Sequence, residues 1–323
     1  MFQSEDAKQL ATTLRRYGRI LFGELSQAFA VATVGTQLER DFLDKLAPAL
    51  KQAFDDLDNL IPEARFSCRT EVVHSRPKGT MASGKSCELG DLLVAVKYRL
   101  LDHTFETKSI LYQVKLADGD TQQCRIDQVQ LGLLKDWPPV SFGKRGDGGP
   151  RTYVVKPNTT EFGSYMLEPR GAPEARLTWE LDIPLSLGPA SGLWDRTYGL
   201  CPTAFQCFQE GPKSVSLKKL PHVFPYVDSM ISHLIFATGE HHINSSVAQF
   251  VAAIYRYLRV APDPPEEFPG ERVESKEDGF ALIEVSVDEQ SPDDAEQRQE
   301  MCVKHQHQRN YRVPNKGIER DKE

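Results

Sequence analysis

The stretch from residue 88 to residue 115 reads ELGDLLVAVKYRLLDHTFETKSILYQVK, and the rest of the chain is organised around it. Two short apolar runs, Leu92–Val96 and Ile110–Val114, stand on either side of a polar segment. Short apolar runs that are rich in β-branched side chains and bounded by polar residues are typical of strands buried on both faces. We therefore expect two strands that pair as a hairpin through the loop near Asp102–Thr107.

Polar side chains stand where the outer ends of these two strands would meet. Asp91 opens the first strand, and Gln113 and Lys115 close the second. Because alternate residues of a strand point to the same face, Gln113 and Lys115 share one face. In an antiparallel hairpin the start of the first strand lies beside the end of the second, so Asp91 is expected next to both.

These three side chains suit a hard divalent cation and phosphate chemistry. Mg²⁺ prefers oxygen ligands and keeps several waters, so one or two carboxylates suffice to hold it, and Mn²⁺ is the alternative ion. Asp91 is the expected ligand, and the side-chain carbonyl of Gln113 would support the coordination. A cation there can polarise a phosphate and generate a hydroxide, while Lys115 orients the attacking water or neutralises developing charge.

The pattern resembles that of the PD-(D/E)XK nucleases, the restriction-endonuclease-like superfamily. Their signature is an acid that enters one strand, followed in the next strand by Asp, Glu or Gln, any residue, and Lys. Here it reads Gly90-Asp91-Leu92-Leu93 and then Gln113-Val114-Lys115, and the resemblance covers residues 38–137. It implies an α/β fold with a mixed sheet flanked by helices, and metal-dependent hydrolysis of phosphodiester bonds in which Asp91, Gln113 and Lys115 are catalytic. Replacing Asp91 or Lys115 by Ala is then expected to remove activity without unfolding the protein.

The resemblance also implies a substrate and a setting. DNA is the expected substrate, with RNA as the alternative, and a protein partner is expected for targeting or regulation. Similar nuclease subunits occur in bacterial anti-phage defence systems, which suggests an effector role. A different class stays open, because Gln113 is uncharged and Asp91 is the one strong anionic ligand of the motif. The chain would then be a non-catalytic nucleic-acid-binding or scaffold subunit. A supporting carboxylate from Glu39, Glu71 or Glu88 near Asp91 would distinguish the nuclease from this non-catalytic alternative.

Two helices are expected before the strands. Apolar residues at three- and four-residue spacing predict a helix over residues 4–30 and another over residues 37–59. Thr36 and Glu39 have the spacing of a capping box for the second helix. The resemblance gives Glu39 an alternative role that Asp41 could also fill, since the first core helix of the nuclease family often carries an acid near the metal. Further patterns predict helices over residues 127–136, 224–236 and 244–258 and strands over residues 66–74, 153–156, 177–183 and 203–208.

A basic, flexible, glycine-containing loop over residues 75–87 is expected to lead into the site. It carries Arg76, Lys78 and Lys85, which are candidate nucleic-acid-binding residues because Lys and Arg neutralise phosphate. An ordinary solvated hairpin loop is the alternative interpretation. Glu88 follows this loop directly, and a bend of the chain before Asp91 would bring its carboxylate to the metal as a further candidate ligand.

The elements and the resemblance divide the chain into three parts. Residues 1–156 form the expected nuclease-like core, and residues 157–260 an α+β elaboration packed on it. From residue 261 prolines stand among acids, so residues 261–323 are expected to be an acidic linker and a partly disordered tail. Within this tail, residues 280–287 alternate well enough for one short strand or a docking segment.

Composition bounds the remaining possibilities. The chain has 323 residues, of which 40% are hydrophobic and 26% charged, and no apolar window is long enough for a transmembrane helix. Its first residues are acidic where a signal peptide would be basic and then apolar, so we expect a cytoplasmic protein without membrane attachment. Six cysteines without C-x-x-C spacing argue against a structural zinc site and are expected to be reduced thiols.

The net charge of −7 is unevenly distributed. Residues 261–323 hold 9 basic and 17 acidic residues, whereas the part before them holds 30 and 29. A near-neutral body can still carry a basic groove, because the distribution of charge matters more than its sum. We expect the acidic segment to compete with nucleic acid for the phosphate-binding groove, so truncation after Val260 should tighten the binding of DNA. The alternative is a solvating tail that has no effect on binding.

Overall fold

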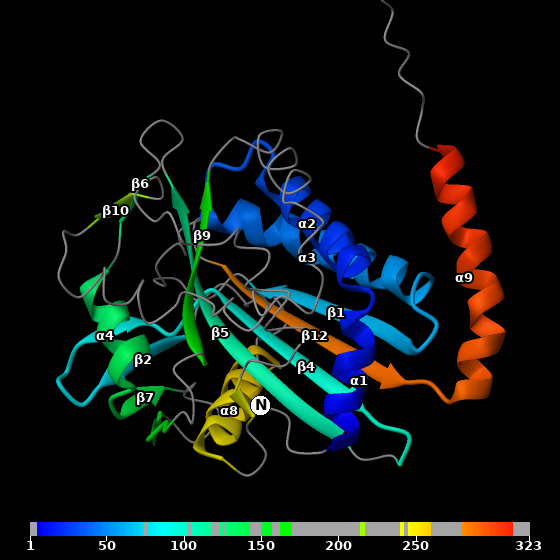
Figure 1. The fold of residues 1–323 in the computed structure, drawn as a ribbon. Coiled ribbons are helices and arrows are strands. Elements are labelled where there is room, and N and C mark those ends of the chain that lie inside the picture. Colours follow the sequence, from blue (N-terminus) through cyan, green and yellow to red (C-terminus); the bar gives the residue numbers. More distant parts are fainter. Residues whose placement is uncertain are drawn as a thin grey trace, which may run out of the picture.

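The computed structural model describes residues 5–73, 77–102, 105–117, 123–125, 127–142, 150–156, 162–169, 214–216, 240–241, 245–259 and 279–312. Its largest element is a mixed sheet of six strands in the order β1–β12–β4–β5–β11, with β9 also paired to β5 (Figure 1). These strands are β1 (Ala64–Val73), β4 (Leu92–Arg99), β5 (Phe105–Ala117), β9 (Gly163–Pro169), β11 (Glu240–His241) and β12 (Phe280–Glu289). β12 runs antiparallel to β1 and parallel to β4, whereas β5 runs antiparallel to β4 and β11 and parallel to β9.

The hairpin expected from the two apolar runs is confirmed. β4 and β5 pair antiparallel from Leu92 opposite Tyr112 to Arg99 opposite Phe105. Both strands are longer than the apolar runs, because polar residues near the turn stay in the ladder. Two of these, Glu106 and Lys108, are almost completely buried.

Three helices precede the sheet: α1 (Glu5–Arg15), α2 (Gly18–Thr33) and α3 (Glu39–Asp58). The single helix expected over residues 4–30 is wrong, because the chain turns between α1 and α2. There the Tyr17 amide donates to the Leu14 carbonyl at 2.9 Å, and Gly18, a poor helix former, begins the next helix. The helix expected over residues 37–59 is confirmed as α3.

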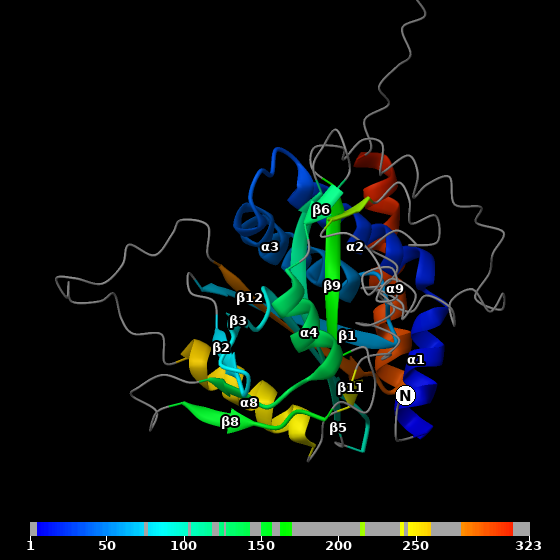
Figure 2. The same ribbon diagram turned by 90° about the vertical axis from the view of Figure 1, so that its left-hand side faces the viewer.

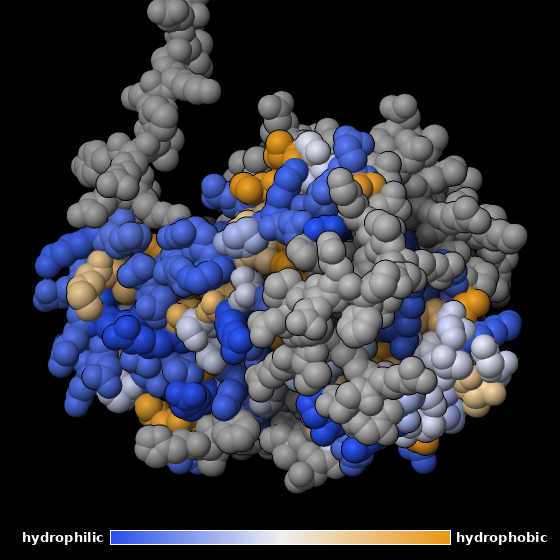
Figure 3. Space-filling model, turned by 180° about the vertical axis from the view of Figure 1, so that it is seen from behind, coloured by the Kyte–Doolittle hydropathy of each residue, from blue (hydrophilic) through white to orange (hydrophobic). Residues whose placement is uncertain are grey.

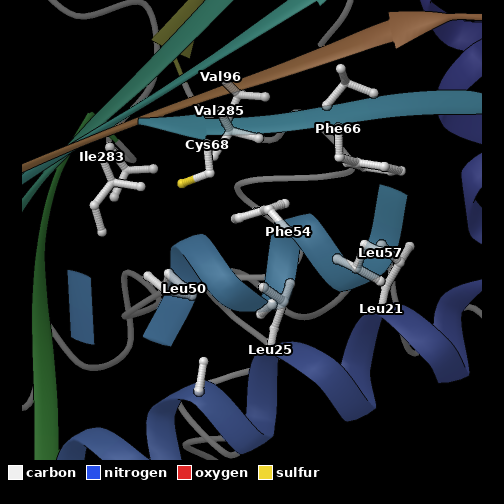
Figure 4. Close-up of a cluster of buried hydrophobic side chains, with 14 of the residues drawn as sticks. Leu21, Leu25, Leu50, Phe54, Leu57, Phe66, Cys68, Val96, Ile283 and Val285 are labelled. Atoms are coloured by element: carbon white, nitrogen blue, oxygen red, sulfur yellow. The ribbon is translucent and has the colours of Figure 1, made fainter. Parts of the chain in front are cut away.

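One face of the sheet forms a hydrophobic core with these helices. Figure 4 shows the side chains of α2 and α3 pointing toward those of β1 and β12. The labelled residues of this cluster are Leu21, Leu25, Leu50, Phe54, Leu57, Phe66, Cys68, Val96, Ile283 and Val285. The apolar stripes that predicted the helices are therefore the surfaces that bury this face of the sheet.

The opposite face of the sheet carries a second core. It is covered by α4 (Gln128–Asp136), α8 (Ser246–Arg259) and a four-stranded sheet in the order β3–β2–β7–β8. The strands of this small sheet are β2 (Lys78–Met81), β3 (Ser86–Glu88), β7 (Val140–Phe142) and β8 (Arg151–Tyr153). Phe250 of α8 lies at the centre of the core, in ring contact with Trp137, Phe142, Tyr153 and Phe162. Helices thus lie on both faces of a mixed sheet, which confirms the α/β class (Figures 1 and 2).

The helices expected over residues 127–136 and 244–258 are confirmed as α4 and α8. Asp127 caps α4, since its side chain accepts from the amides of Val129 and Gln130 at 2.7 and 3.1 Å. Ser245 caps α8 by accepting from the Ala248 amide at 3.1 Å. The strand expected over residues 66–74 is confirmed as β1, and the one expected over residues 153–156 lies earlier, as β8.

The expectation of a flexible loop over residues 75–87 is wrong for residues 77–87, which form the hairpin of β2 and β3. The turn between them has Gly84 at a φ of +77°, a conformation that favours glycine. Gly79 makes the close packing of β2 possible, because a Cβ there would lie 2.4 Å from Val140 and 2.5 Å from Leu89. The turn and the close packing both depend on glycines, which had indicated flexibility in the sequence.

The C-terminal part needs the largest correction. The short strand that was one alternative for residues 280–287 is confirmed as β12, but this strand lies between β1 and β4 in the main sheet and buries most of its side chains, rather than belonging to a tail. α9 (Pro292–Arg312) follows, in a part that was expected to be a partly disordered tail. Seen from behind, the side of the molecule that α9 occupies is mostly hydrophilic (Figure 3). α9 carries four acidic and four basic residues, so the net negative charge of residues 261–323 does not come from this helix.

The expected strands over residues 177–183 and 203–208 and the expected helix over residues 224–236 lie outside the described residues. β6 (Gln123–Arg125) and β10 (Ser214–Ser216) pair antiparallel as a separate two-stranded sheet. In the part of the chain that the structure describes, no helix combines the length and the apolar character that a membrane crossing requires.

Candidate functional site

The site is built where β4 begins, beside its two neighbouring strands. The Asp91 amide donates to the Tyr112 carbonyl of β5 at 2.8 Å, and the Asp91 carbonyl accepts from the Ala281 amide of β12 at 2.8 Å. Gly90 lets the chain enter so close to β5, since a Cβ there would lie 2.8 Å from the Leu111 side chain and 3.0 Å from the Tyr112 carbonyl. The backbone of Asp91 is therefore fixed by strands from two distant parts of the sequence.

The side chain of Asp91 contacts the end of β5, as the hairpin geometry predicts. Its Oδ2 accepts from the Val114 amide at 2.7 Å and from the Gln113 side-chain amide. Asp91 is 0% exposed and Gln113 is 1% exposed, so both polar groups lie in the interior. The carboxylate satisfies two donors of β5, and it has a role in the fold whatever else it does.

Lys115 contacts the helix before the sheet. Its ammonium donates to Glu39 Oε1 at 3.0 Å, and the two side chains are 16% and 23% exposed. Glu39 is the first residue of α3, where a carboxylate is also favoured by the positive end of the helix dipole. Of the candidate metal ligands outside the two strands, Glu39 is thus the one whose carboxylate contacts a residue of the motif.

The capping box expected for Thr36 and Glu39 is wrong. Leu38 stands at the N-cap of α3, and no side-chain hydrogen bond caps that end. The Thr36 hydroxyl donates instead to the Ala32 carbonyl at 2.6 Å, at the end of α2. Glu39 is therefore not engaged in capping, and its carboxylate is turned toward Lys115.

A second contact places the start of α3 beside Asp91. Gly279, the residue before β12, is so close to α3 that a Cβ on it would lie 3.2 Å from the side chain of Arg40. Two residues later, Ala281 donates its amide to Asp91. The first turn of α3, the start of β12 and the start of β4 therefore meet at one corner of the main sheet.

Glu88 lies with α4 rather than with Asp91. Its Oε2 accepts from the Gln130 side chain at a long 3.5 Å, and Gln130 is 7% exposed. Among the described residues, no group of three or more His, Cys, Asp or Glu side chains stands close enough to hold a metal ion. Glu88 is therefore not brought together with Glu39 and Asp91 as a three-acid cluster.

The neighbourhood of Glu88 is electronegative. Cys87 precedes it on β3, and burial, followed by the negative charges of Asp127 and Glu88, raises the pKa of its thiol to about 11. Sequence reasoning missed the contact of Gln130 with Glu88. The available signal was the cap at Asp127, which fixes the position of Gln130 in the first turn of α4.

The candidate nucleic-acid-binding residues fall on the small sheet. Lys78 stands on β2 opposite Glu88, and Lys85 lies in the turn before β3; both are exposed. Arg76 lies outside the described residues. The two lysines are thus available to an anionic ligand, although they are held on a hairpin rather than on a flexible loop.

Comparison of the chain with protein-family models, with curated proteins and with solved structures found no match.

Proposed function

We propose that the chain is a metal-dependent nuclease that hydrolyses phosphodiester bonds, with DNA as its expected substrate. The observation that carries this proposal is a pair of side-chain contacts at one corner of the sheet, Asp91 with Gln113 and Glu39 with Lys115, in which Gln113 and Lys115 are two residues apart on β5. An acid, an amide, an ammonium and a second acid from three separate elements are the groups that such chemistry requires. The arrangement supports a restriction-endonuclease-like core as the finer description of the fold.

The donor set fits a hard divalent cation. The Asp91 and Glu39 carboxylates and the Gln113 side-chain carbonyl are oxygen ligands, and Mg²⁺ or Mn²⁺ takes one or two carboxylates together with waters and substrate oxygens. A three-acid cluster is therefore not required. When bound, the ion would polarise the phosphate and lower the pKa of a water.

The remaining chemistry belongs to the side chains of the protein. Lys115 carries a positive charge that would stabilise the negative charge that develops on the phosphate in the transition state. The contact with Glu39 holds the Lys115 ammonium in a defined position in the absence of substrate. The buried contacts of Asp91 with β5 hold its carboxylate in one orientation, so little reorganisation is needed when substrate binds.

The experiment is a plasmid-cleavage assay with Mg²⁺ or Mn²⁺, repeated with chelator. Lys115→Met should cleave about 10² to 10³ times more slowly than the wild type, the usual effect of losing one preorganised charge. Lys51→Met is the matched control, because it removes an exposed ion pair with Asp55 on α3, at 2.6 Å, within that helix. Cleavage at an undiminished rate in chelator, or by Lys115→Met, would contradict the proposal.

A second function is favoured by one specific observation. Oδ2 of Asp91 already accepts hydrogen bonds from two donors of its own hairpin, and the described residues contain no cluster of three acids. In a non-catalytic nucleic-acid-binding or scaffold subunit, the same contacts would serve only the fold. Such a protein would bind DNA but leave it intact with every divalent ion, and Lys115→Met would change nothing except affinity.

A further inference from the structure

The outward face of the small sheet carries a row of hydroxyl groups. Each strand contributes one residue, in the spatial order Ser86 of β3, Thr80 of β2, Ser141 of β7 and Thr152 of β8. These residues are direct register partners across the sheet, so their side chains project from the same face. We call these four residues the hydroxyl row.

The hydroxyl row is continuous and open to solvent. The hydroxyls of Thr80 and Ser86 are hydrogen-bonded at 2.8 Å, and those of Ser141 and Thr152 at 2.6 Å. Ser141 is half-buried and the other three are exposed, whereas Met81, Val140 and Phe142 bury the opposite face of the sheet. Figure 3 shows pale residues of intermediate hydropathy on the side of the molecule away from α9.

The charges around the hydroxyl row are mainly positive. Lys78 and Lys85 are exposed, whereas Glu88, the register partner of Lys78, is half-buried. Arg151 is also exposed, but as the register partner of Phe142 it projects from the other face. Lys78 stands two residues before Thr80 and is exposed on the same face. A positive, hydroxyl-rich surface in an acidic protein is complementary to phosphate.

The β3 end of the row is linked to the candidate site through the chain. Ser86 precedes Asp91 by five residues, a separation of at most about 18 Å. Ser and Thr hydroxyls, Lys and Arg make most of the phosphate contacts in complexes with nucleic acids, and these contacts position the ligand without reading its sequence.

We propose that the hydroxyl row and its flanking lysines form the docking surface for the phosphate backbone of nucleic acid, which they hold against the Asp91 site irrespective of base sequence. This inference rests on the proposed function for its substrate. It adds the surface, the kind of contact and the lack of sequence preference.

The test is binding of a fluorescein-labelled DNA duplex, measured by anisotropy in chelator so that nothing is cleaved. Thr80→Glu combined with Thr152→Glu places two negative charges in the row and should weaken binding at least about tenfold at low salt. Lys78→Ala combined with Lys85→Ala leaves the row intact and should reduce the slope of log K against log salt by about 1 to 2. Thr12→Glu is the control, since Thr12 is an exposed threonine on α1.

The outcomes separate this inference from the proposed function. The docking surface would be supported and the nuclease overturned if the two double variants show the expected weaker binding and lower salt slope, with unchanged circular dichroism, while the wild type never cleaves DNA. Metal-dependent cleavage with wild-type affinity in both double variants would overturn the docking surface and leave the nuclease. A wild type that does not bind DNA at low salt, or that prefers one sequence strongly over another of equal length, would also overturn it.

Discussion

At the scale of single residues, Asp91 has a structural role that is separate from any catalytic one. Asp91→Ala leaves the buried Val114 amide and the Gln113 side chain without their acceptor. Each buried donor left unsatisfied costs about 1 to 3 kcal/mol, so the free energy of unfolding should fall by at least about 2 kcal/mol. Urea denaturation measures this loss, and Asp91→Asn, which keeps a side-chain oxygen, should lose less.

The prediction that Asp91→Ala removes activity without unfolding the protein has to be tested together with this loss of stability. Activity lost by Asp91→Ala has to be compared with its folded fraction, whereas Lys115→Met, at a partly exposed position, gives the cleaner comparison. If Asp91→Ala unfolds at the same urea concentration as the wild type, its hydrogen bonds contribute nothing to stability.

Cys87 reports on the negatively charged surroundings of Glu88. Burial and two carboxylates disfavour the thiolate, so the pKa rises from 9.0 to about 11. Below pH 9, where the thiol predominates in both states, a shift of this size lowers the thiolate fraction about a hundredfold. Because the thiolate is the nucleophile, a variant that keeps Cys87 as its single cysteine should react with iodoacetamide far more slowly when folded than in urea. Equal rates in the two states would contradict the burial of this thiol.

At the scale of the elements, the central position of β12 determines what a truncation after Val260 does to the fold. Removing everything after Val260 deletes the strand that separates β1 from β4, together with its hydrogen bonds to both. We expect this truncation to abolish folding rather than to tighten DNA binding, as circular dichroism and thermal melting would show. Truncation after Arg312 keeps β12 and α9 and should melt like the full chain. A cooperative, native-like melt of the shorter protein would contradict the central position of β12.

α9 is fixed to the body of the protein by one buried arginine. The Arg298 guanidinium donates to the Pro62 and Ala64 carbonyls at 3.1 and 2.8 Å, and to the backbone and side chain of Asp58 at the end of α3. Arg298→Met leaves these buried acceptors unsatisfied and should lower the free energy of unfolding by about 3 kcal/mol.

Lys304→Ala on the same helix is the matched control for Arg298. Lys304 is 75% exposed and stands 4.0 Å from Glu300, so its loss should change stability by less than about 0.5 kcal/mol. Similar effects of the two substitutions in urea denaturation would show that Arg298 does not anchor α9.

The elements also show what a sequence pattern can and cannot predict. The β4–β5 hairpin was predictable because its partners are neighbours in sequence, and Asp91 and Gln113 came together with it. The place of β12 was not, since its alternating pattern says nothing about partners that precede it by about 200 residues. The anchor at Arg298 was hidden for another reason: its acceptors are mainly backbone carbonyls, which carry no signal in the sequence.

At the scale of the whole molecule, the site depends on how the three layers pack. The contact of Glu39 with Lys115 requires that the start of α3 reach the corner of the sheet. That position is set by the core between α2, α3 and one face of the sheet, and by the fit of Gly279 against Arg40. Sequence spacing offered Glu39 only as one of several candidates, because the packing that selects it is not local.

The last prediction uses the stability of the whole molecule to detect the ion. A ligand that binds only the folded state stabilises it by RT ln(1 + [L]/Kd), about 2.7 kcal/mol at a hundred times Kd. If Asp91, Gln113 and Glu39 hold Mg²⁺ or Mn²⁺, the melting temperature should rise steadily with the concentration of the ion. Because the two cores share one sheet, the rise should appear in the main transition.

Two variants assign this rise to the corner of the sheet. Glu39→Gln keeps the size of the side chain but removes one carboxylate, so the rise in melting temperature should shrink at equal ion concentration. Glu300→Gln, at an exposed position of α9, removes the same charge far from the proposed ligands and should leave the rise unchanged. An equal rise in the wild type and in Glu39→Gln would show that Glu39 is not a ligand. A melting temperature that does not respond to either ion would show that the four side chains bind no cation and serve only the fold, because a bound cation has to stabilise the state that binds it.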